Sequence, residues 1–566
     1  MMDRIQRLRE KNGEALNILL ITAVYIATHW FLLAATGRWW DDWAYADRNW
    51  DYMIEVFMQS SLPLHAVINA FTWLFPHGFY RILTFVYFYA GAVLLYKILK
   101  KTGLFTSSDC VMITVLYIGI PINDARIAWI NYAYSFGLFM FFIAFYVAAR
   151  FKESTGWRRI AFRILSLLLL LISFDTESIM MLTLFVLAYL YHDDFKGGWD
   201  HSVRGFIKKL AGSVARHIDF LIAPVAWYFG DKILFPGYGV YGGHSYVRTD
   251  SLMGTVVHAP VNTAITLKNI LGSYYTALTA SPAVAVFAGV LALAVFVISL
   301  ISGKKNKTDE DSSLMKTILL FLVGAAAFVI GIFPYLVNRD ASILNTFTRG
   351  RDTMLLGIGT AFMLYYFLRM LLRREFVKPA VAVLAVLASV HFLTTYLEWQ
   401  ESAYQQYQLQ HEMAENRNLK DNDTFLIMYS GALINSNYCQ TIGNSWEVLG
   451  PRKLFYMPGV SGIRYMMNDS EQKERILNEW KMTDYRSGDG VIDGIVFVDY
   501  ADIGFYDMIV QKWVELTDRE AFDAWIDSLR DIRYVPITPS ESDKLYELTS
   551  EGTLTDEMIY DMYYRK

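Results

Sequence analysis

Cysteine, proline and charge are all scarce in this sequence. Its 566 residues include 2 cysteines, 13 prolines and only 19% charged residues. Cys110 lies in an apolar run and Cys439 in the C-terminal tail, so the two do not make a disulfide framework, and they match no metal-ligand spacing. The net charge of −4 gives no basic footprint for nucleic acid. The composition therefore argues against a disulfide-rich domain, a cysteine-ligated metal site and a nucleic-acid partner.

Apolar residues, in contrast, are abundant. The chain is 54% hydrophobic and 16% aromatic, which is far from the composition of an average cytosolic protein. Its first apolar run, from Leu16 to Ala35, is too long for the core of a signal peptide and ends at Trp39-Trp40 without a small-residue cleavage site. We interpret this run as an uncleaved first membrane helix, with the bilayer as the main solvent.

The apolar runs predict a polytopic α-helical membrane protein with about eleven transmembrane helices, because a helix needs about 20 apolar residues to cross the hydrocarbon core. The predicted spans are 15–36, 79–98, 107–121, 127–149, 160–174, 178–192, 218–235, 280–302, 316–337, 352–372 and 379–397. The short fifth and sixth spans also fit one re-entrant hairpin. The charged break at Asp175-Thr176-Glu177 favours two crossings.

The distribution of Lys and Arg between the loops predicts the orientation. Alternate loops, beginning with residues 1–14, hold about 25 Lys and Arg, whereas the intervening loops hold about 8 over a greater length. The first set is therefore expected in the cytoplasm, with the N-terminus. An odd number of spans places the C-terminal tail on the outer side of the membrane.

The tail, residues 398–566, has no run long enough to span and is expected to be a soluble, extracytoplasmic α/β domain. Thr424–Tyr429 and Gly494–Val498 are short apolar runs typical of buried strands, and Asp518–Ile532 has the pattern of an amphipathic helix. The tail contains no catalytic motif. Residues 1–397 form the predicted transmembrane module.

The large first outer loop, 37–78, begins with two adjacent aspartates, Asp41 and Asp42, at the end of the first span. An aspartate at the membrane edge loses solvation, so it is retained more often for chemistry or for an ion pair than one in open solvent. Neighbours on a helix point about 100° apart, so one of the two would be a catalytic base and the other a structural partner. The alternative is a solvated helix cap paired with Arg38 or Arg48.

A second acidic pair, Asp175 and Glu177, lies in a very short outer loop. Three arginines also occur on the outer side, where the positive-inside bias disfavours them: Arg339, Arg349 and Arg351. The guanidinium group offers a fork of donors that matches phosphate oxygens, so a lipid-linked phosphate is a natural partner. Alternatively, the acidic pair is a polar turn, and the arginines reach lipid headgroups or pair with Asp340 or Asp352.

Two further segments supply candidate substrate-binding residues. A Gly- and Tyr-rich outer loop, 235–244, contains Tyr241, whose ring can stack on a sugar, although the loop also fits a merely flexible connection. His258, Arg126 and Lys268 are weaker candidates for the cavity in which the outer arginines would bind a lipid-linked phosphate.

The arrangement resembles the GT-C superfamily of polytopic glycosyltransferases and, more loosely, the bacterial serotype-type glucosyltransferases. The resemblance covers residues 1–397. It rests on the many spans, on Trp40-Asp41-Asp42-Trp43 opening a large first outer loop, on Glu177 at a later span end, and on Arg349-x-Arg351 before a late span.

The resemblance implies a chemistry as well as a fold. A first-loop aspartate, Asp41 or Asp42, would deprotonate the acceptor hydroxyl, which attacks the anomeric carbon of a polyprenyl-phosphate sugar and inverts its configuration. Glu177 would be the second catalytic carboxylate, Arg349, Arg351 and Arg339 would hold the leaving phosphate, and Trp43, Asp175, Tyr241 and His258 would contact substrate. The first loop has no acidic-x-acidic metal motif, so the sequence does not decide whether a divalent metal ion takes part.

The implied partners are a polyprenyl-phosphate sugar, a cell-envelope glycan or glycolipid acceptor, and the lipids of a bacterial plasma (inner) membrane. Three other readings remain open. A polysaccharide polymerase or ligase would also favour outer arginines but needs a large arginine-bearing central loop. A transporter or flippase of lipid-linked sugars would have Gly/Pro-broken sites near the midplane. A structural membrane protein would use the tail to recruit partners.

Overall fold

The structure is a computed structural model of the chain. It describes residues 2–39, 42, 50–196, 202–239, 252–279, 282–303, 314–339, 350–415, 417–418, 424–431, 455–468, 491–500 and 503–564. The chain forms two compact units. Unit 1 comprises Met1–Ala34, Ser61–Gly237 and Gly243–Thr394, and unit 2 comprises Ala35–Ser60, Tyr238–Gly242 and Thr395–Lys566. The predicted first outer loop, 37–78, is thus divided between the units.

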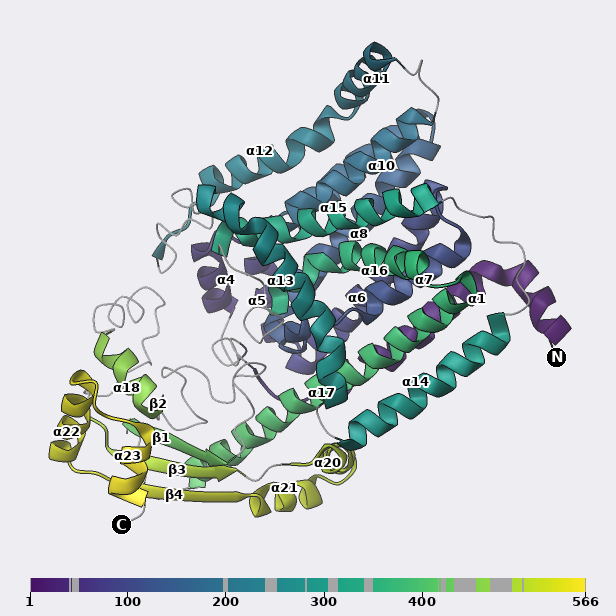
Figure 1. Ribbon diagram of the computed structural model, residues 1–566. Coiled ribbons are helices and arrows are strands. Elements are labelled where there is room, and N and C mark those ends of the chain that lie inside the picture. The colour runs from purple at the N-terminus through teal and green to yellow at the C-terminus, as the bar shows by residue number, and fades with distance from the viewer. Residues whose placement is uncertain are drawn as a thin grey trace. The chain divides into compact units, whose positions relative to one another are not determined.

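All the regular elements among the described residues of unit 1 are helices (Figure 1). Its α-helices are α1 (Met2–His29), α2 (Phe31–Ala34), α5 (Pro63–Ala70), α6 (His77–Thr102), α7 (Ser107–Gly119), α8 (Tyr132–Glu153), α9 (Gly156–Ser173), α10 (Thr183–Phe195), α11 (Val203–Arg216), α12 (Ile218–Leu234), α13 (Leu252–Thr279), α14 (Pro282–Gly303), α15 (Leu314–Arg339), α16 (Gly357–Leu371) and the first half of α17 (Arg374–Glu415). Short 3-10 helices are η1 (Phe71–Leu74), η2 (Asp124–Ile127), η3 (Trp129–Asn131), η4 (Glu177–Leu182) and η6 (Gly350–Leu356).

Six helical segments are long and apolar enough to cross a bilayer, so the protein is a membrane protein with multiple spanning helices. Among the described residues these segments are Gly78–Thr102, Trp129–Glu153, Pro282–Ser299, Leu314–Val337, Gly350–Leu371 and Arg374–Gln405, and each coincides with a predicted span. The other five predicted spans are occupied by shorter or more charged helices. The first, for example, is interrupted at Trp30, between α1 and α2.

Close packing in unit 1 depends on small residues where two helices meet. α15 packs along α16, and α8 packs against both α6 and α9 (Figure 1). A Cβ atom added at Gly359 of α16 would lie 2.3 Å from the backbone nitrogen of Phe328, and one at Gly324 of α15 would lie 2.7 Å from the Cβ of Phe362. Glycine lets two backbones approach this closely, as is usual where helices associate in membranes.

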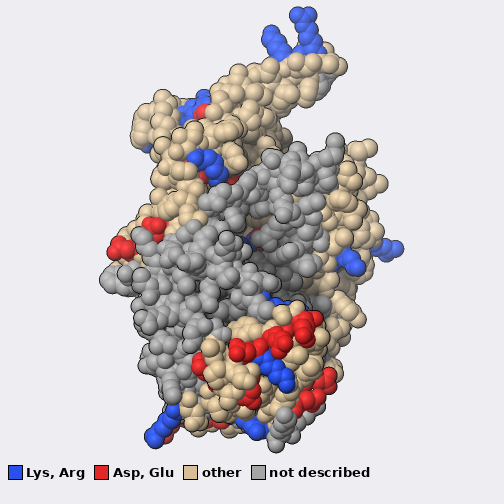
Figure 2. Space-filling view, turned by 90° about the vertical axis from the view of Figure 1, so that its left-hand side faces the viewer, with Lys and Arg blue, Asp and Glu red and all other residues tan. Residues whose placement is uncertain are grey.

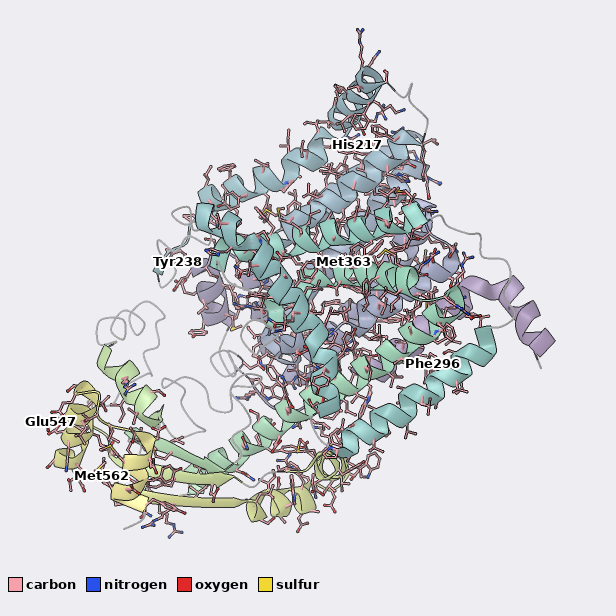
Figure 3. All side chains as sticks on the ribbon, in the orientation of Figure 1. His217, Tyr238, Phe296, Met363, Glu547 and Met562 are labelled. Carbon is pink, nitrogen blue, oxygen red and sulfur yellow. The ribbon has the colours of Figure 1, made fainter. Side chains whose placement is uncertain are left out.

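A buried carboxylate joins α10 to the junction of α11 and α12. Asp194 is 9% exposed, and it accepts hydrogen bonds from Lys152 at 2.5 Å and from Ser213 at 2.7 Å. The carboxylate of Asp194 also pairs with Arg216 at 2.9 Å and with His217 at 3.1 Å. His217 lies at the junction of α11 and α12 (Figure 3). Burial raises the pKa of Asp194, but the hydrogen bonds from Lys152 and Ser213 outweigh it and lower the pKa to about 2.

Unit 2 contains a four-stranded sheet with the strand order β2-β1-β3-β4. β1 is parallel to β2 and β3, with Leu426 opposite Ile495, and β3 is antiparallel to β4. The strands are β1 (Thr424–Gly431), β2 (Phe455–Pro458), β3 (Gly494–Tyr500) and β4 (Arg530–Pro536). The helices are α4 (Trp50–Gln59), the second half of α17, α18 (Gly459–Asn468), α20 (Phe505–Thr517), α21 (Arg519–Ser528), α22 (Pro539–Ser550), α23 (Asp556–Ile559) and the π-helix η7 (Tyr560–Tyr564).

Both strands predicted in the tail are present, as β1 and β3, but the predicted helix 518–532 is wrong at its end. The helix α21 stops at Ser528, and Arg530 already begins strand β4. Val498 of β3 lies opposite Ile532, so pairing with the sheet overrides the helical periodicity of the last residues. Leu426, Ile495, Phe497 and Leu545 lie in an apolar core of this unit.

The surface of α22 is charged. Asp543, Lys544 and Glu547 are exposed, and Glu547 points outward from the helix (Figure 3). Figure 2 shows acidic and basic side chains together in the lower part of its view, where these C-terminal helices lie. A charged, mixed surface of this kind is typical of contact with water.

Candidate active site

The predicted acidic pair, Asp175 and Glu177, lies where α9 ends and η4 begins, and its two members have different surroundings. Asp175 is 4% exposed and accepts hydrogen bonds from the backbone N–H groups of Leu64 at 3.1 Å and His65 at 2.7 Å. These are the first-turn donors of α5, whose N-cap residue Leu62 provides no side-chain cap. Asp175 therefore caps α5 from a distant segment, because a carboxylate satisfies the orphan N–H groups of a helix N-terminus.

The same carboxylate also orients an imidazole. Nδ1 of His65 lies 2.5 Å from Oδ2 of Asp175, and the side chains of both residues are almost completely buried. With a proton on Nδ1, which the contact with a carboxylate favours, the basic nitrogen of the neutral ring is Nε2. The two oxygens of Asp175 thus serve three donors, which gives this residue a positioning role.

Tyr134, in the first turn of α8, connects this pair to an arginine. Its ring lies 5.2 Å from the ring of His65, with the guanidinium of Arg351 5.5 Å away on the tyrosine face. Nη1 of Arg351 donates to the Tyr134 hydroxyl at 3.4 Å, and Nε lies 3.9 Å from Oδ1 of Asp352. The arginine side chain is 28% exposed. A guanidinium that is held by stacking and is still partly exposed can be reached by an anion.

Glu177 lies on the more open side of the turn. Its carboxylate accepts a hydrogen bond from Lys232, near the end of α12, at 2.6 Å, and the two side chains are 27% and 35% exposed. The next residue, Ser178, accepts a hydrogen bond from Tyr335 of α15 at 3.2 Å. One polar cluster within unit 1 is thus formed near the ends of α5, α8, α12, α15, η4 and η6. We call it the acidic-turn cluster, and its residues are His65, Tyr134, Asp175, Glu177, Ser178, Lys232, Tyr335, Arg351 and Asp352.

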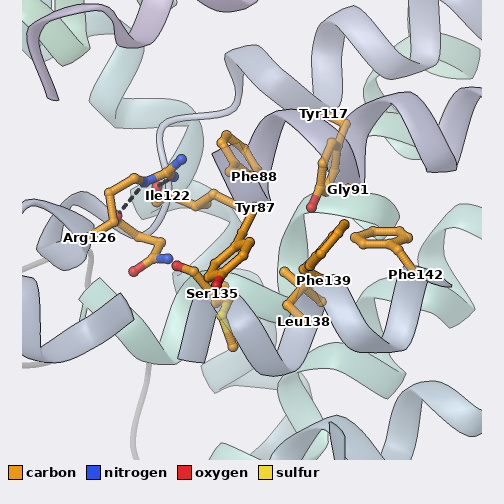
Figure 4. A pocket seen from close by; sticks show the side chains of 12 residues that line it. Tyr87, Phe88, Gly91, Tyr117, Ile122, Arg126, Ser135, Leu138, Phe139 and Phe142 are labelled. Atoms are coloured by element: carbon orange, nitrogen blue, oxygen red, sulfur yellow. Dashed lines mark hydrogen bonds between the residues drawn. The ribbon is translucent and has the colours of Figure 1, made fainter. Parts of the chain in front are cut away.

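A second polar group lies beside a small cavity between α6, α7 and α8 (Figure 4). Arg126 is 3% exposed and donates to the backbone carbonyls of Asn123, at 2.8 Å, and Ile122. Its guanidinium lies 4.3 Å from the ring of Phe88. The cavity volume is about 20 Å³, enough for about one water molecule. Arg126 therefore holds together the loop between α7 and η3, and this cavity is too small for a sugar.

Not every predicted site residue belongs to the acidic-turn cluster. Asp175, Glu177 and Arg351 do. Asp42 belongs to unit 2, where it is fully buried and its Oδ2 accepts a hydrogen bond from the Trp39 backbone at 3.1 Å. His258 is exposed on α13, and Arg339 is the last residue of α15, with its side chain outside the described part. Four predicted residues lie outside the described residues altogether: Asp41, Trp43, Tyr241 and Arg349.

Sequence reasoning assigned no catalytic or binding role to His65, Tyr134 or Lys232. The first two come from different segments and meet only in the folded protein, and Lys232 lies at the end of a predicted span, where a lysine usually reaches lipid headgroups. No group of three or more His, Cys, Asp or Glu side chains is arranged to hold a metal ion within the described ranges. The acidic-turn cluster combines carboxylates, an oriented imidazole and cationic donors.

Comparison with known proteins gives little further information. No protein-family model and no curated protein matches the sequence. Among solved structures, the chain is similar to the crystal structure of ArnT from Cupriavidus metallidurans in the apo state, with a TM-score of 0.31 and 12% identity, over 90% of this chain and 95% of that chain. Similarity at this level does not establish a shared fold.

Proposed function

We propose that the protein is a membrane glycosyltransferase of the GT-C type, which transfers a hexose from a polyprenyl-phosphate donor to a cell-envelope glycan or glycolipid at the outer face of the plasma membrane. The observation that carries the proposal is the environment of Arg351. Its guanidinium is held against Tyr134, remains partly exposed and lies in the same cluster as Glu177 and Lys232. Such a fixed cationic fork at the end of membrane helices suits a phosphate attached to a lipid.

The reaction needs a base and an electrostatic partner for the leaving group. Asp42 is fully buried and accepts a hydrogen bond from the Trp39 backbone, so of the two first-loop aspartates we assign Asp42 the structural role and Asp41 the role of base. Asp41 takes the proton of the acceptor hydroxyl, whose oxygen attacks the anomeric carbon. The bond between that carbon and the phosphate oxygen breaks, with inversion, and polyprenyl phosphate leaves. Arg351, assisted by Arg349 and Arg339, offsets the charge that develops on the phosphate, because preorganised donors stabilise charge formed in the transition state.

The carboxylates of the acidic turn have separate roles in this proposal. Glu177 is partly exposed and has a lysine partner, so of the two carboxylates in the acidic turn we assign it the contact with the sugar or the acceptor. Asp175 already serves three donors of α5, so we assign it to positioning His65 in place of direct substrate contact. The sidedness of the loops supports an outer location for both carboxylates.

The test is donor turnover by the purified protein in lipid nanodiscs. Polyprenyl-phosphate glucose and other polyprenyl-phosphate hexoses would be supplied with a candidate glycan acceptor, and sugar transfer would be followed by mass spectrometry. Arg351→Ala should weaken donor binding, and Asp41→Asn or Glu177→Gln should abolish turnover while donor still binds. Arg150→Ala is the matched control, because Arg150 is half-exposed and pairs with Glu153 at 3.6 Å on the side predicted to be cytoplasmic.

The outcome separates the functional classes. Loss of transfer in a carboxylate variant with donor binding retained supports a transferase. If the wild-type protein instead moves the intact lipid-linked sugar between leaflets and releases no polyprenyl phosphate, the transporter reading replaces ours.

A further inference from the structure

In helix α20 of unit 2, polar side chains are buried and apolar side chains are exposed, which is the reverse of the pattern expected for a surface helix in water. Lys512 is only 4% exposed, and the side chain of Glu515 is 4% exposed. The exposed side chains are apolar and recur at helical spacing: Tyr506 (60%), Ile509 (40%), Val510 (55%), Trp513 (68%) and Leu516 (58%). A surface helix in water turns its apolar stripe inward, so the outward stripe of α20 indicates a different medium on that side.

The buried polar face is held by a closed network. Nζ of Lys512 donates to Glu515 at 2.7 Å, to Thr36 at 2.9 Å and to Gln400 at 3.3 Å. Glu515 also accepts hydrogen bonds from Thr36 at 2.6 Å and from the hydroxyl of Tyr404 at 2.7 Å. Because each of these contacts satisfies a buried polar group, the orientation of α20 is fixed, and its apolar face cannot simply rotate inward.

The partners of α20 lie where the chain leaves the membrane. Thr36 comes directly after the first apolar run and the short helix α2, and Gln400 and Tyr404 lie at the end of the candidate span Arg374–Gln405. From Pro379 to Gln400, α17 rises about 32 Å at about 1.5 Å per residue, slightly more than the roughly 30 Å of the hydrocarbon core. The network therefore lies at the depth of the lipid headgroups, and α20 lies there with it.

We propose that α20 is an interfacial membrane helix whose Tyr506–Leu516 face inserts into the headgroup region of the leaflet at which α17 ends. Tryptophan and tyrosine favour this zone of the bilayer, and the stripe contains Trp513 and Tyr506. α20 is hydrogen-bonded to Gln400 and Tyr404, in the part of α17 that belongs to the same unit. The C-terminal unit is thus attached to the membrane by its own surface as well as by the spanning helix. This inference does not depend on the proposed transferase activity.

Site-directed spin labelling of the full-length protein in nanodiscs tests the proposal. Cys110→Ala and Cys439→Ser would remove the native thiols, and a nitroxide would be attached at Val510→Cys or, as a second position on the same face, at Ile509→Cys. Lys544→Cys on α22 is the control, because Lys544 is exposed in the same unit. The accessibility of each label to oxygen, which partitions into lipid, and to a water-soluble nickel chelate would then be measured.

Labels on the α20 face should show high oxygen accessibility with a loss of nickel accessibility, at a depth of about 5–10 Å below the headgroup surface, whereas the Lys544 label should behave as fully aqueous. Equal nickel accessibility at Val510, Ile509 and Lys544 would overturn the proposal. Low accessibility of the two α20 positions to both reagents would also overturn it, because it would show that protein, from this chain or a second copy, covers the face.

Discussion

Replacement of Asp175 gives the sharpest test of the acidic-turn cluster. Asp175→Ala removes the acceptor for three donors, two backbone N–H groups of α5 and Nδ1 of His65, at 3.1, 2.7 and 2.5 Å. Each buried donor left without a partner costs about 1–3 kcal/mol. Breaking a buried pair costs about 3–5 kcal/mol, so we expect a loss of that size in the free energy of unfolding. Asp175→Asn keeps one carbonyl oxygen and should lose less.

The matched control lies two residues along the same turn. Glu177→Ala breaks the partly exposed pair with Lys232, and such pairs contribute only about 0–1 kcal/mol. Unfolding would be followed in mixed detergent micelles by titration with a denaturing detergent, with His65→Ala and the double variant completing a cycle. The cycle should give a coupling of about 0.5–3 kcal/mol between residues in contact. If Asp175→Ala and Glu177→Ala unfold at the same midpoint, Asp175 is not the cap of α5.

Three further predictions concern other parts of the molecule. Arg351→Lys should lose most of the donor binding lost by Arg351→Ala, about 10-fold or more in KM for a polyprenyl-phosphate sugar, because an ammonium cannot replace a stacked fork; full activity of the lysine variant would contradict this. Gly359→Ala should destabilise unit 1 by about 1–3 kcal/mol, measured by thermal unfolding in detergent, because the new methyl group meets the Phe328 backbone. The folded-state pKa of Asp194 is lowered to about 2, so its contribution to stability is present above its ordinary pKa and is lost as pH falls through about 4 to 2. Acid unfolding of Asp194→Asn should lack this component, and an unchanged acid transition would show that Asp194 does not supply it.

The long apolar helices could be predicted from the sequence because the bilayer imposes a length on them. Six predicted spans correspond to such helices, including Leu314–Val337 and Arg374–Gln405. Composition does not show where a helix breaks inside an apolar run, as at Trp30, or where its first turns tighten into a 3-10 helix, as at Glu177–Leu182. These details depend on the packing of neighbouring helices.

The site could be predicted only as separate pieces. Asp175 and Glu177 stood out because they are charged groups between two apolar runs, and Arg351 because it opposes the usual charge bias. His65 and Asp175 are 110 residues apart, so no local pattern indicates that they meet. Strand β4 was missed for a related reason, because its pairing with β3 outweighs a helical periodicity that continues beyond Ser528.

The orientation of α20 could not be predicted from the sequence either. Its residues alone describe an ordinary amphipathic helix, and only the burial of Lys512 and Glu515 shows which face points inward. Thr36 and Gln400 lie more than a hundred residues from α20 in the sequence, yet their hydrogen bonds decide its orientation.

The most direct test of the account is sugar transfer by the wild-type protein in nanodiscs, with a polyprenyl-phosphate sugar as donor. We predict release of polyprenyl phosphate, formation of a glycosylated acceptor with inverted anomeric configuration, and weakened donor binding in Arg351→Ala but not in Arg150→Ala. No transfer from any polyprenyl-phosphate hexose, or equal donor binding by the two arginine variants, would contradict the proposed function.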